Sequence, residues 1–342
     1  MSEEERLRKQ RKPSIHELQV KSLASKFWGL DVVDLHPLDS YDDCNHYLLA
    51  NDKKFILKVY NGAESPFTLE GFAYLFHWLE RQKSHYLFPT IQSSLNNNSI
   101  EFISSESNEY SYGVRLFHWI PGRTLRDIDK SSELYHFQQI GQMLAHLTIA
   151  LQGFHHDSFS RIHAWDLKQF DTVLSFVSSV PEHDIRSIIE EIHLAYRQRL
   201  LPSTTALRWS CIHGDPNDAN IIINDKDQVV GLIDFGDAVY TWTVNDIASA
   251  MCYALLTSYG KEHPEEVLLA VFGSYHAVYR LTDVELKFVK ILIAMRLSLS
   301  IAIGAYSIAQ SPKDAYLTLH AIPAKDALRF VWNLPNDFFT RL

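Results

Sequence analysis

The sequence predicts an α+β fold with two lobes, a β-rich lobe at residues 1–119 and a mainly helical lobe at residues 120–342. The first third of the chain consists of short β-prone runs that polar turns separate. Pro121 and Gly122 end the last of these runs. Beyond them, apolar residues recur at steps of three and four, which is the period of an amphipathic helix.

In the first lobe we expect a sheet and one helix. The helix covers residues 66–82, because Ser65 is a suitable N-cap, Pro66 fits the first helical position, and apolar residues follow at helical spacing. The strands are expected at residues 31–36, 46–50, 54–60, 87–92, 99–104 and 112–119.

In the second lobe we expect a series of helices that a single β-rich island interrupts. The island covers residues 208–240 and contains two strongly apolar strands with polar loops at their ends. The helices are expected at residues 134–151, 167–178, 182–200, 244–258, 264–279, 283–308 and 314–332.

The composition is that of an ordinary globular chain and argues against several classes of function. Hydrophobic residues make up 46% of the chain and charged residues 21%. The hydrophobic share is enough for a packed core that needs no covalent cross-links. The formal net charge of -9 argues against a nucleic-acid partner. Cys44, Cys211 and Cys252 are widely spaced and form no CxxC pair, so we expect neither disulfides nor zinc, and a cytoplasmic location.

Two segments could be mistaken for targeting or membrane signals. Residues 1–13 are too highly charged for a signal peptide, and we expect a flexible tail there. Residues 291–309 are the most membrane-like stretch, but Arg296 and several serines interrupt it, and it falls short of a span of about 20 apolar residues. We therefore expect a buried helix and no membrane partner.

The β-rich island carries a set of polar residues suited to one kind of chemistry. Asp215 and Asn220 lie in the loop before the first apolar strand, and Asp234 follows the second strand. Transfer of a phosphoryl group to an alcohol needs a carboxylate that accepts the hydroxyl proton, and oxygen ligands that hold magnesium against the phosphates. These three side chains supply that set.

The spacing of these residues is that of a known catalytic loop. Asn220 lies five positions after Asp215, as in the HRDxxxxN loop of protein kinases, and Asp234 begins an Asp-Phe-Gly triplet. The stretch HGDPNDAN at residues 213–220 resembles the HGDxxxxN motif of the aminoglycoside phosphotransferase and choline kinase superfamily. The stretches SYDDCN (40–45), ILKVYN (56–61), VRLFHWIPGR (114–123), LQGFHH (151–156) and GLIDFGD (231–237) look like those of its hydroxylysine kinase branch.

This resemblance implies a protein-kinase-like fold and gives roles to individual residues. Asp215 would be the catalytic base, and Asn220 and Asp234 the Mg²⁺ ligands. Lys58, on a predicted strand, would bind the phosphates of the nucleotide, with Glu70 on the helix at residues 66–82 as the candidate partner. His213 would have a structural role in the loop.

The remaining nucleotide contacts are expected in two segments. The segment at residues 40–45 contains no glycine where protein kinases have a glycine-rich loop, but Ser40 and backbone N–H groups can still approach phosphate. The segment at residues 116–123 would join the lobes, with backbone groups near His118 and Ile120 facing the purine. Both ATP and GTP remain open as donor, and the hydroxylysine kinase likeness favours GTP.

The acceptor is the least defined part of the sequence prediction. A cationic amine requires carboxylates, and Asp218 and Asp237 are the nearest in sequence to the catalytic elements, while Trp242 could stack on an ammonium or belong to the core. An amino-acid acceptor would also need a cation for its carboxylate. Arg115, Arg123 and Arg296 are all possible there.

We therefore expect a small-molecule kinase that phosphorylates the hydroxyl of an amine or amino acid. The resemblance makes hydroxylysine the leading acceptor, and homoserine, choline, ethanolamine or an aminoglycoside the alternatives. A pseudokinase that binds a nucleotide without turnover is the alternative of a different class. No protein partner is predicted.

Overall fold

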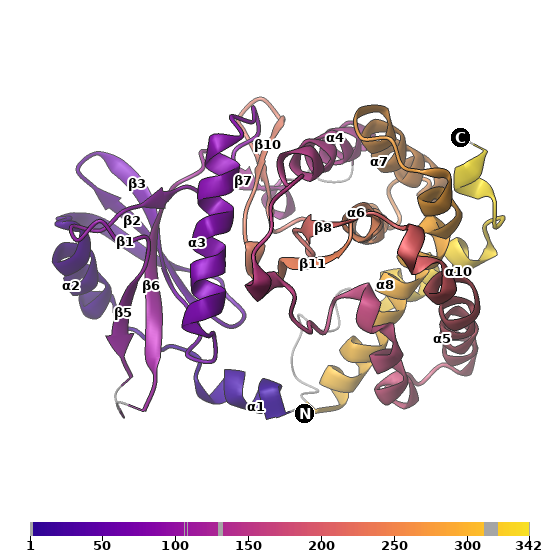
Figure 1. Ribbon diagram of the computed structural model, residues 1–342, viewed down its shortest axis with the longest axis horizontal. Coiled ribbons are helices and arrows are strands. Elements are labelled where there is room, and N and C mark those ends of the chain that lie inside the picture. Colours follow the sequence, from indigo (N-terminus) through magenta and orange to yellow (C-terminus); the bar gives the residue numbers. More distant parts are fainter. Residues whose placement is uncertain (1–2, 106, 108, 129–132, 311–320, 342) are drawn as a thin grey trace. The chain divides into compact units, whose positions relative to one another are not determined.

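A computed structural model describes residues 3–105, 107, 109–128, 133–310 and 321–341 (Figure 1). Two compact units divide the chain. The first consists of residues 1–83, 87–121 and 156–158, and the second of residues 84–86, 122–155 and 159–342. The expected α+β class is confirmed, with strands concentrated in the first unit and helices in the second.

The first unit is built on an antiparallel sheet in the order β1-β2-β3-β6-β4, with β5 also paired to β6. Helices α2 (Glu17–Trp28) and α3 (Pro66–Arg81) accompany this sheet, and Figure 1 shows it between them. The strands are β1 (Val32–Leu38), β2 (Cys44–Ala50), β3 (Lys53–Val59), β4 (Ile91–Gln92), β5 (Glu101–Ser104) and β6 (Ser111–His118).

The turn between β2 and β3 determines which side chains face α3. Asn51 and Asp52 both have positive φ angles, 51° and 58°, as a two-residue type I′ turn requires, and Asn and Asp tolerate this conformation. The resulting register pairs Asn45 with Lys58. Because side chains alternate along a strand, Lys58 lies on the face of β3 opposite the buried Leu57.

One of the two helices beside this sheet was expected from the sequence. The expected helix is present as α3: the Ser65 side chain accepts a hydrogen bond from the backbone of Thr68, and Pro66 is the first residue. Helix α2 was not expected, although Val20, Leu23 and Phe27 lie at helical spacing and Gly29 ends the helix as a left-handed C-cap. It buries Val20 and Phe27 in the core on the Leu57 face of the sheet.

The segment that we expect to be a tail, residues 1–13, contains helix α1 (Glu3–Gln10) and contacts the rest of the unit. The Arg8 guanidinium donates to Asp42 Oδ2 at 3.0 Å and also to Glu64. Lys12 Nζ donates to the backbone oxygens of Ser40 (3.2 Å) and Tyr41 (2.6 Å). The N-terminal segment is therefore held against residues 40–43.

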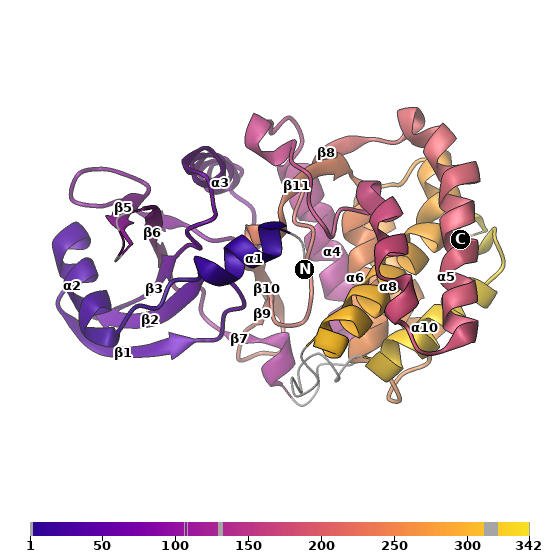
Figure 2. The same ribbon diagram turned by 90° about the horizontal axis from the view of Figure 1, so that it is seen from below.

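The second unit is mainly helical. Helix α4 packs along α7, and α8 contacts α5, α6 and α10; Figure 2 shows α5, α8 and α10 side by side. The helices are α4 (Leu134–Ala150), α5 (His183–Ala195), α6 (Val244–Thr257), α7 (Pro264–Val278), α8 (Asp283–Gln310) and α10 (Ala321–Asn333). The start of the helix expected at residues 314–332 lies outside the described residues.

One expected helix, at residues 167–178, has a different form. The segment is made of the 3₁₀ helices η3 (Leu167–Ser175) and η4 (Val177–Ser179). The buried residues Leu167, Phe170 and Val173 are spaced by three, and a 3₁₀ helix, with three residues per turn, places them on one face. The helix expected at residues 182–200 likewise ends in a π-helical turn, Tyr196–Leu200.

The β-rich island forms two small antiparallel sheets in the second unit. Strand β8 (Trp209–Ile212) pairs with β11 (Val239–Trp242), and β9 (Ile221–Ile223) pairs with β10 (Val229–Leu232) and with β7 (Arg123–Thr124). Ile212 is opposite Val239, and Ile221 is opposite Leu232. This register brings the loop at residues 213–220 beside the loop at residues 233–238.

Helix α8 contains the apolar stretch at residues 291–309. Among the described residues it is the helix long and apolar enough to cross a membrane by length and composition, but 78% of its most apolar window is buried inside the fold. That burial is typical of the core helix of a globular unit, as we expect from the sequence.

Candidate active site

The loop that follows β8 is fastened to α6 by one buried carboxylate. Asp246, in the first turn of α6 and 2% exposed, accepts hydrogen bonds from the backbone N–H groups of His213 (3.0 Å) and Gly214 (2.8 Å). The positive end of the helix dipole also favours a carboxylate in this position. These bonds fix the backbone immediately before Asp215.

Two further features shape the same loop. Gly214 has a φ of +86°, and a Cβ there would lie 2.6 Å from the backbone oxygen of Asp237, so the position requires glycine. His213 Nε2 donates to the Ile233 backbone oxygen (2.9 Å), and its Nδ1 accepts from the Asp215 backbone N–H (3.2 Å). His213 thus braces the two neighbouring loops.

The Asp215 carboxylate accepts hydrogen bonds on both oxygens. Oδ1 accepts from the Tyr253 hydroxyl and from Arg296 Nη2 at 3.3 Å. Oδ2 accepts from Asn217 Nδ2 at 2.7 Å and from Asn220 Nδ2 at 3.3 Å. The carboxylate is therefore held in one orientation by four donors.

The environment of Asp215 alters its proton affinity. Burial raises the pKa of Asp215 above its ordinary value, the negative charge of Asp237 raises it further, and the charge of Arg296 counteracts both effects. Burial also raises the pKa of Tyr253 well above that of a free phenol, so its hydroxyl keeps its proton and donates. A carboxylate with a raised pKa is a better proton acceptor than an ordinary one.

Arg296 supplies the positive charge nearest to this carboxylate. It comes from α8 and is 1% exposed. Its Nη1 donates to the Trp165 backbone oxygen (3.1 Å) and its Nη2 to the Tyr253 hydroxyl (2.6 Å), while the guanidinium lies 4.8 Å from the Trp165 ring centroid. These contacts fix the guanidinium against Asp215.

Asn220 and Asp234 are brought together by the pairing of their loops. The backbone N–H of Ile233 donates to the Asn220 backbone oxygen at 2.9 Å. Asn220 Nδ2 donates to the Asp215 backbone oxygen at 2.9 Å, which leaves the Asn220 amide oxygen as a ligand atom. Asp234 is exposed and has a left-handed backbone with a φ of 59°.

This donor set fits magnesium. An amide oxygen and a carboxylate are hard ligands, and Mg²⁺ usually combines one or two such protein ligands with phosphate and water oxygens. Within the described residues, no group of three or more His, Cys, Asp or Glu side chains is placed to hold a metal ion, so a closed all-protein cage is not found there.

The three predicted acceptor residues have different surroundings. Asp237 lies 3.4 Å from His163 Nε2; burial alone would raise its pKa, but the hydrogen bond and charge of His163 outweigh it, and the pKa is lowered to about 2. Asp218 forms a bidentate pair with Arg126, at 2.8 and 3.2 Å. Trp242 is 1% exposed, so its ring offers no open face for stacking in this structure.

The predicted phosphate-binding residues lie in the first unit. Lys58 Nζ lies 2.8 Å from Asp43 Oδ2, and Asp43 Oδ1 accepts from the Asn61 backbone N–H at 2.9 Å. Ser40 Oγ accepts from the Asp43 backbone N–H at 3.1 Å. The structure thus pairs Lys58 with a carboxylate of the segment at residues 40–45.

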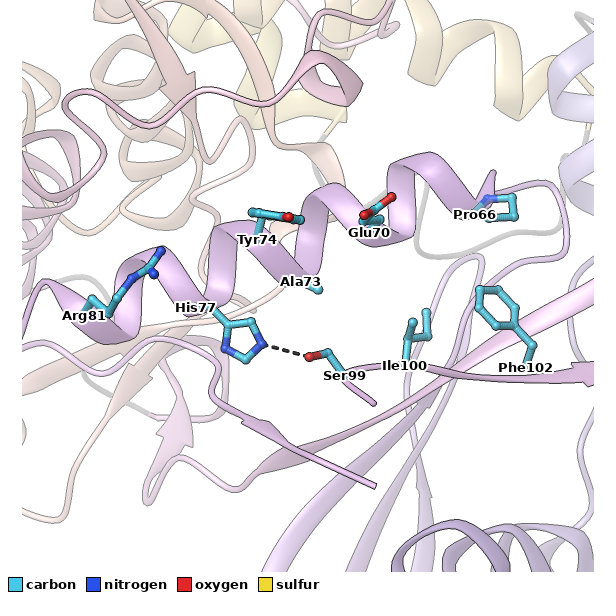
Figure 3. A pocket seen from close by; sticks show the side chains of 9 residues that line it. All are labelled: Pro66, Glu70, Ala73, Tyr74, His77, Arg81, Ser99, Ile100 and Phe102. Atoms are coloured by element: carbon cyan, nitrogen blue, oxygen red, sulfur yellow. Dashed lines mark hydrogen bonds between the residues drawn. The ribbon is translucent and has the colours of Figure 1, made fainter. Parts of the chain in front are cut away.

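Glu70, the partner expected for Lys58, lies on the exposed surface of α3. It lines a cavity of about 570 Å³ between this helix and β5, together with Tyr74 and Arg81. Figure 3 shows this cavity and the 2.8 Å hydrogen bond between His77 Nε2 and Ser99 Oγ at its edge. Lys58 is not among the residues that line it.

The segment expected to face the purine follows β6. His118 is the last residue of that strand, and its backbone N–H donates to the Thr90 oxygen at 3.0 Å. Ile120 lies two residues beyond the strand and is half-buried. Both residues belong to the first unit, in the stretch of that unit that runs from Leu87 to Pro121.

The three arginines considered for an acceptor carboxylate have different surroundings. Arg115 is buried and donates to the Tyr60 hydroxyl at 2.6 Å. Arg123 is exposed on β7. Arg296 lies beside Asp215.

Sequence reasoning did not foresee the distant contacts of the Asp215 loop. Tyr253 donates to Asp215 and Asp246 accepts from the loop backbone, and both lie on α6. Arg296, which the sequence offered as a partner for an acceptor carboxylate, donates to Asp215 from α8. One signal was present for Arg296, because it is a charge within a long apolar stretch, and such a buried charge needs a partner.

The chain matches known proteins over most of its length. The model of the phosphotransferase enzyme family matches residues 35–284. Hydroxylysine kinase of Bos taurus is 29% identical over 337 residues, which cover 91% of this chain and 87% of that protein. Hydroxylysine kinase of Danio rerio is 24% identical over 347 residues, which cover 96% and 95%.

Solved structures have the same fold. The amicoumacin kinase hAmiN, in complex with AMP-PNP, Ca²⁺ and Ami, matches with a TM-score of 0.72 at 14% identity, over 98% of this chain and 99% of that chain. A microcompartment-associated aminopropanol kinase matches with a TM-score of 0.68 at 16% identity, over 95% and 98%. These structural matches confirm the kinase-like fold, and the sequence matches confirm the resemblance read from residues 40–237. The protein therefore belongs to the phosphotransferase enzyme family.

Proposed function

We propose that the protein transfers the γ-phosphoryl group of ATP or GTP to the hydroxyl of a small amine or amino acid, with hydroxylysine as the leading acceptor. The observation that carries this proposal is the Asp215 carboxylate, held by four donors in a loop beside the oxygens of Asn220 and Asp234. The identity with hydroxylysine kinases supports the acceptor.

Each residue of the proposed site has its own role in this reaction. Asp215 accepts the proton of the acceptor hydroxyl while the hydroxyl oxygen forms a bond to the γ-phosphorus. The bond between the γ-phosphorus and the nucleoside diphosphate breaks, and the diphosphate leaves. Asn220 and Asp234 would hold Mg²⁺, which neutralises phosphate charge when bound. Lys58 would bind the nucleotide phosphates. We also propose a cytoplasmic location, since Cys44, Cys211 and Cys252 are free thiols.

The direct test is nucleoside diphosphate release from ATP and from GTP, with magnesium, against hydroxylysine, homoserine, choline, ethanolamine and an aminoglycoside. We expect acceptor-dependent release with hydroxylysine. Release with another member of the panel would replace hydroxylysine as the acceptor. If the protein bound nucleotide but released no nucleoside diphosphate with any of these acceptors, the result would contradict the kinase activity and favour a nucleotide-binding pseudokinase.

Lys58→Met is expected to weaken nucleotide binding by about 10-fold or more, because a charged hydrogen bond to phosphate is lost. Lys54→Met is the matched control, since Lys54 is exposed on the same face of β3. Nucleotide affinity can be measured by calorimetry in the presence of magnesium. Equal affinities for the two variants would remove Lys58 from the phosphate site.

Asp234→Asn is expected to raise the magnesium concentration needed for half-maximal activity by about 10-fold or more, since a neutral amide binds a hard cation less tightly than a carboxylate does. Asp225→Asn, in the exposed turn between β9 and β10, is the control. Magnesium titrations at saturating nucleotide measure the effect. An unchanged midpoint in Asp234→Asn would argue against a ligand role.

A further inference from the structure

The N-terminal segment, residues 3–13, is attached to the first unit by backbone contacts as well as by its charges. The backbone N–H of Gly62 donates to the Arg11 oxygen at 3.0 Å, and Arg11 Nη1 donates to the Gly62 oxygen at 3.4 Å. The Arg11 guanidinium also lies 4.8 Å from the ring centroid of Tyr110. These contacts hold the segment against the turn that follows β3, so the fold itself sets the position of Arg8.

Asn61 connects the N-terminal segment to the segment at residues 40–45. It is 1% exposed, and its Nδ2 donates to the Arg8 backbone oxygen at 2.9 Å and to the Asp42 backbone oxygen at 3.2 Å. Its own backbone N–H donates to Asp43 Oδ1 at 2.9 Å. One buried residue therefore fixes the backbones of Arg8 and Asp42 relative to each other.

Two adjacent carboxylates of the segment at residues 40–45 are paired with cations. Lys58 Nζ lies 2.8 Å from Asp43 Oδ2, and Arg8 Nη1 lies 3.0 Å from Asp42 Oδ2. The Arg8 and Asp42 side chains are only 25% and 30% exposed. Salt and water screen such a partly buried pair less than two fully exposed ions, so the charge of Arg8 has a real effect on its surroundings.

The charges around Asp42 show that it lies close to the Lys58 site. Burial raises the pKa of Asp42, the Arg8 guanidinium lowers it, the negative charge of Asp43 raises it, and Lys12 lowers it by a smaller amount. Asp42 and Asp43 are therefore close enough for their charges to interact, and Asp43 is in contact with Lys58. A negative charge on Asp42 that Arg8 did not balance would act on any anion that Lys58 binds.

A nucleotide at Lys58 has to approach these carboxylates. Phosphate oxygens and carboxylate oxygens attract the same ammonium and repel one another. Asp43 already pairs with Lys58, so the phosphates compete with one carboxylate. With Arg8 in place, the charge of Asp42 is balanced locally and adds little to this competition. Without Arg8, Asp42 adds a second negative charge beside the phosphates.

We propose that Arg8 is a positioning residue of the nucleotide site, which neutralises Asp42 and so allows the phosphates of the nucleotide to approach Lys58. This statement rests on the phosphate-binding role proposed for Lys58. It makes the N-terminal segment a working part of the nucleotide site. An ion pair with a purely structural role would behave differently, because loss of either partner would then weaken nucleotide binding. Neutralisation predicts opposite effects of removing Arg8 and of removing the charge of Asp42.

The test measures the affinity for non-hydrolysable analogues of ATP and GTP by calorimetry in the presence of magnesium. Arg8→Met should weaken binding by about 10-fold, because a carboxylate close to the phosphates loses its counter-charge. Asp42→Asn should bind the nucleotide no more weakly than the wild-type protein does. Arg8→Met combined with Asp42→Asn should recover most of the lost affinity. Lys9→Met is the matched control, because Lys9 is exposed on the same helix and carries the same charge.

Two further measurements separate charge from packing. Arg8→Lys keeps the positive charge and should retain most of the nucleotide affinity. Salt should reduce the effect of Arg8→Met relative to Lys9→Met, because the Debye length falls from about 30 Å at 0.01 M to about 3 Å at 1 M ionic strength. Thermal unfolding of each variant verifies that the folded protein is measured.

Several outcomes would overturn this role of Arg8. Weaker nucleotide binding in both Arg8→Met and Asp42→Asn would make the pair a structural contact only. Arg8 also donates to Glu64, so recovery of Arg8→Met by Glu64→Gln in place of Asp42→Asn would contradict the neutralisation of Asp42. Equal affinities in Arg8→Met and Lys9→Met would contradict it as well.

Turnover separates this failure from that of the proposed function. If hydroxylysine is phosphorylated while Arg8→Met binds the nucleotide as tightly as Lys9→Met does, the kinase activity stands and the role of Arg8 falls. If Arg8→Met shows the expected loss and Asp42→Asn the expected recovery, but no acceptor is phosphorylated, the role of Arg8 stands and the kinase activity falls.

Discussion

Asp215→Asn should lower kcat for phosphoryl transfer by about 10³-fold, because the carboxylate that we propose as acceptor of the hydroxyl proton becomes an amide that cannot accept it. The shape of the side chain is kept, and its oxygen can still accept hydrogen bonds from Tyr253 and Arg296. The neutral amide breaks the ion pair with the buried Arg296, so thermal stability should fall, while nucleotide binding should be close to that of the wild-type protein under conditions in which the variant is folded. Single-turnover assays with hydroxylysine separate the chemical step from product release.

The same variant has a built-in control in nucleotide affinity. A large fall in kcat with an unchanged dissociation constant for the nucleotide assigns the loss to the transition state. If Asp215→Asn retained more than a tenth of the wild-type kcat, Asp215 would not be the base. If nucleotide binding were lost as well, the effect would belong to loop structure.

Arg296→Met should shift the acid side of the pH–rate profile to higher pH. The base must be ionised to work, so activity rises as pH passes the pKa of Asp215. Burial and the charge of Asp237 raise that pKa, and Arg296 lowers it. Removing the guanidinium therefore raises the pKa of Asp215 further. At a pH below that pKa, kcat/KM falls about 10-fold for every tenfold increase in the proton affinity of Asp215.

Two further variants distinguish the effect of the Arg296 charge from the effects of its packing and hydrogen bonds. Arg296→Lys keeps the positive charge but loses the planar fork, so it should restore the position of the acid limb more than it restores kcat. Tyr253→Phe removes one donor to Asp215 and no charge, and we expect a smaller shift. An acid limb in Arg296→Met at the wild-type position would show that the guanidinium does not set the ionisation of Asp215.

Loss of Arg296 should also destabilise the fold. The side chain is buried, and its removal leaves Asp215 without its nearest opposite charge. Breaking a buried ion pair costs about 3–5 kcal/mol, and the lower end applies here because Asp215 keeps its other donors and is partly exposed. Thermal unfolding beside the pH–rate measurements shows whether the variant remains folded under assay conditions.

The parts of the site that the sequence predicts are those encoded locally. Asp215, Asn220 and Asp234 lie within one short segment, and the strands between them are strongly apolar, so chain order already implies their proximity. The start of α3 was predictable for the same reason, because Ser65 and Pro66 act on neighbouring residues.

The parts that were not predicted depend on contacts between distant segments. The pairing of Lys58 with Asp43 follows from the register of β2 and β3, and many carboxylates could have been its partner. Tyr253 and Arg296 reach Asp215 from two separate helices, and helix packing sets those contacts. Helix α2 is an exception, because its own sequence carries helix signals, a capping box formed by His16 and Gln19 and a left-handed Gly29 at its end.

The clamp between Asp246 and the catalytic loop has a consequence for local opening of the chain. The amide hydrogens of His213 and Gly214 belong to a loop, yet both are bonded to a buried carboxylate on a core helix. They can exchange with solvent only when their hydrogen bonds to Asp246 break. Their protection from hydrogen exchange should therefore follow that of α6. Hydrogen exchange would then group this loop with the slowest-exchanging part of the second unit, and the enzyme would lose its catalytic loop only when it loses its core.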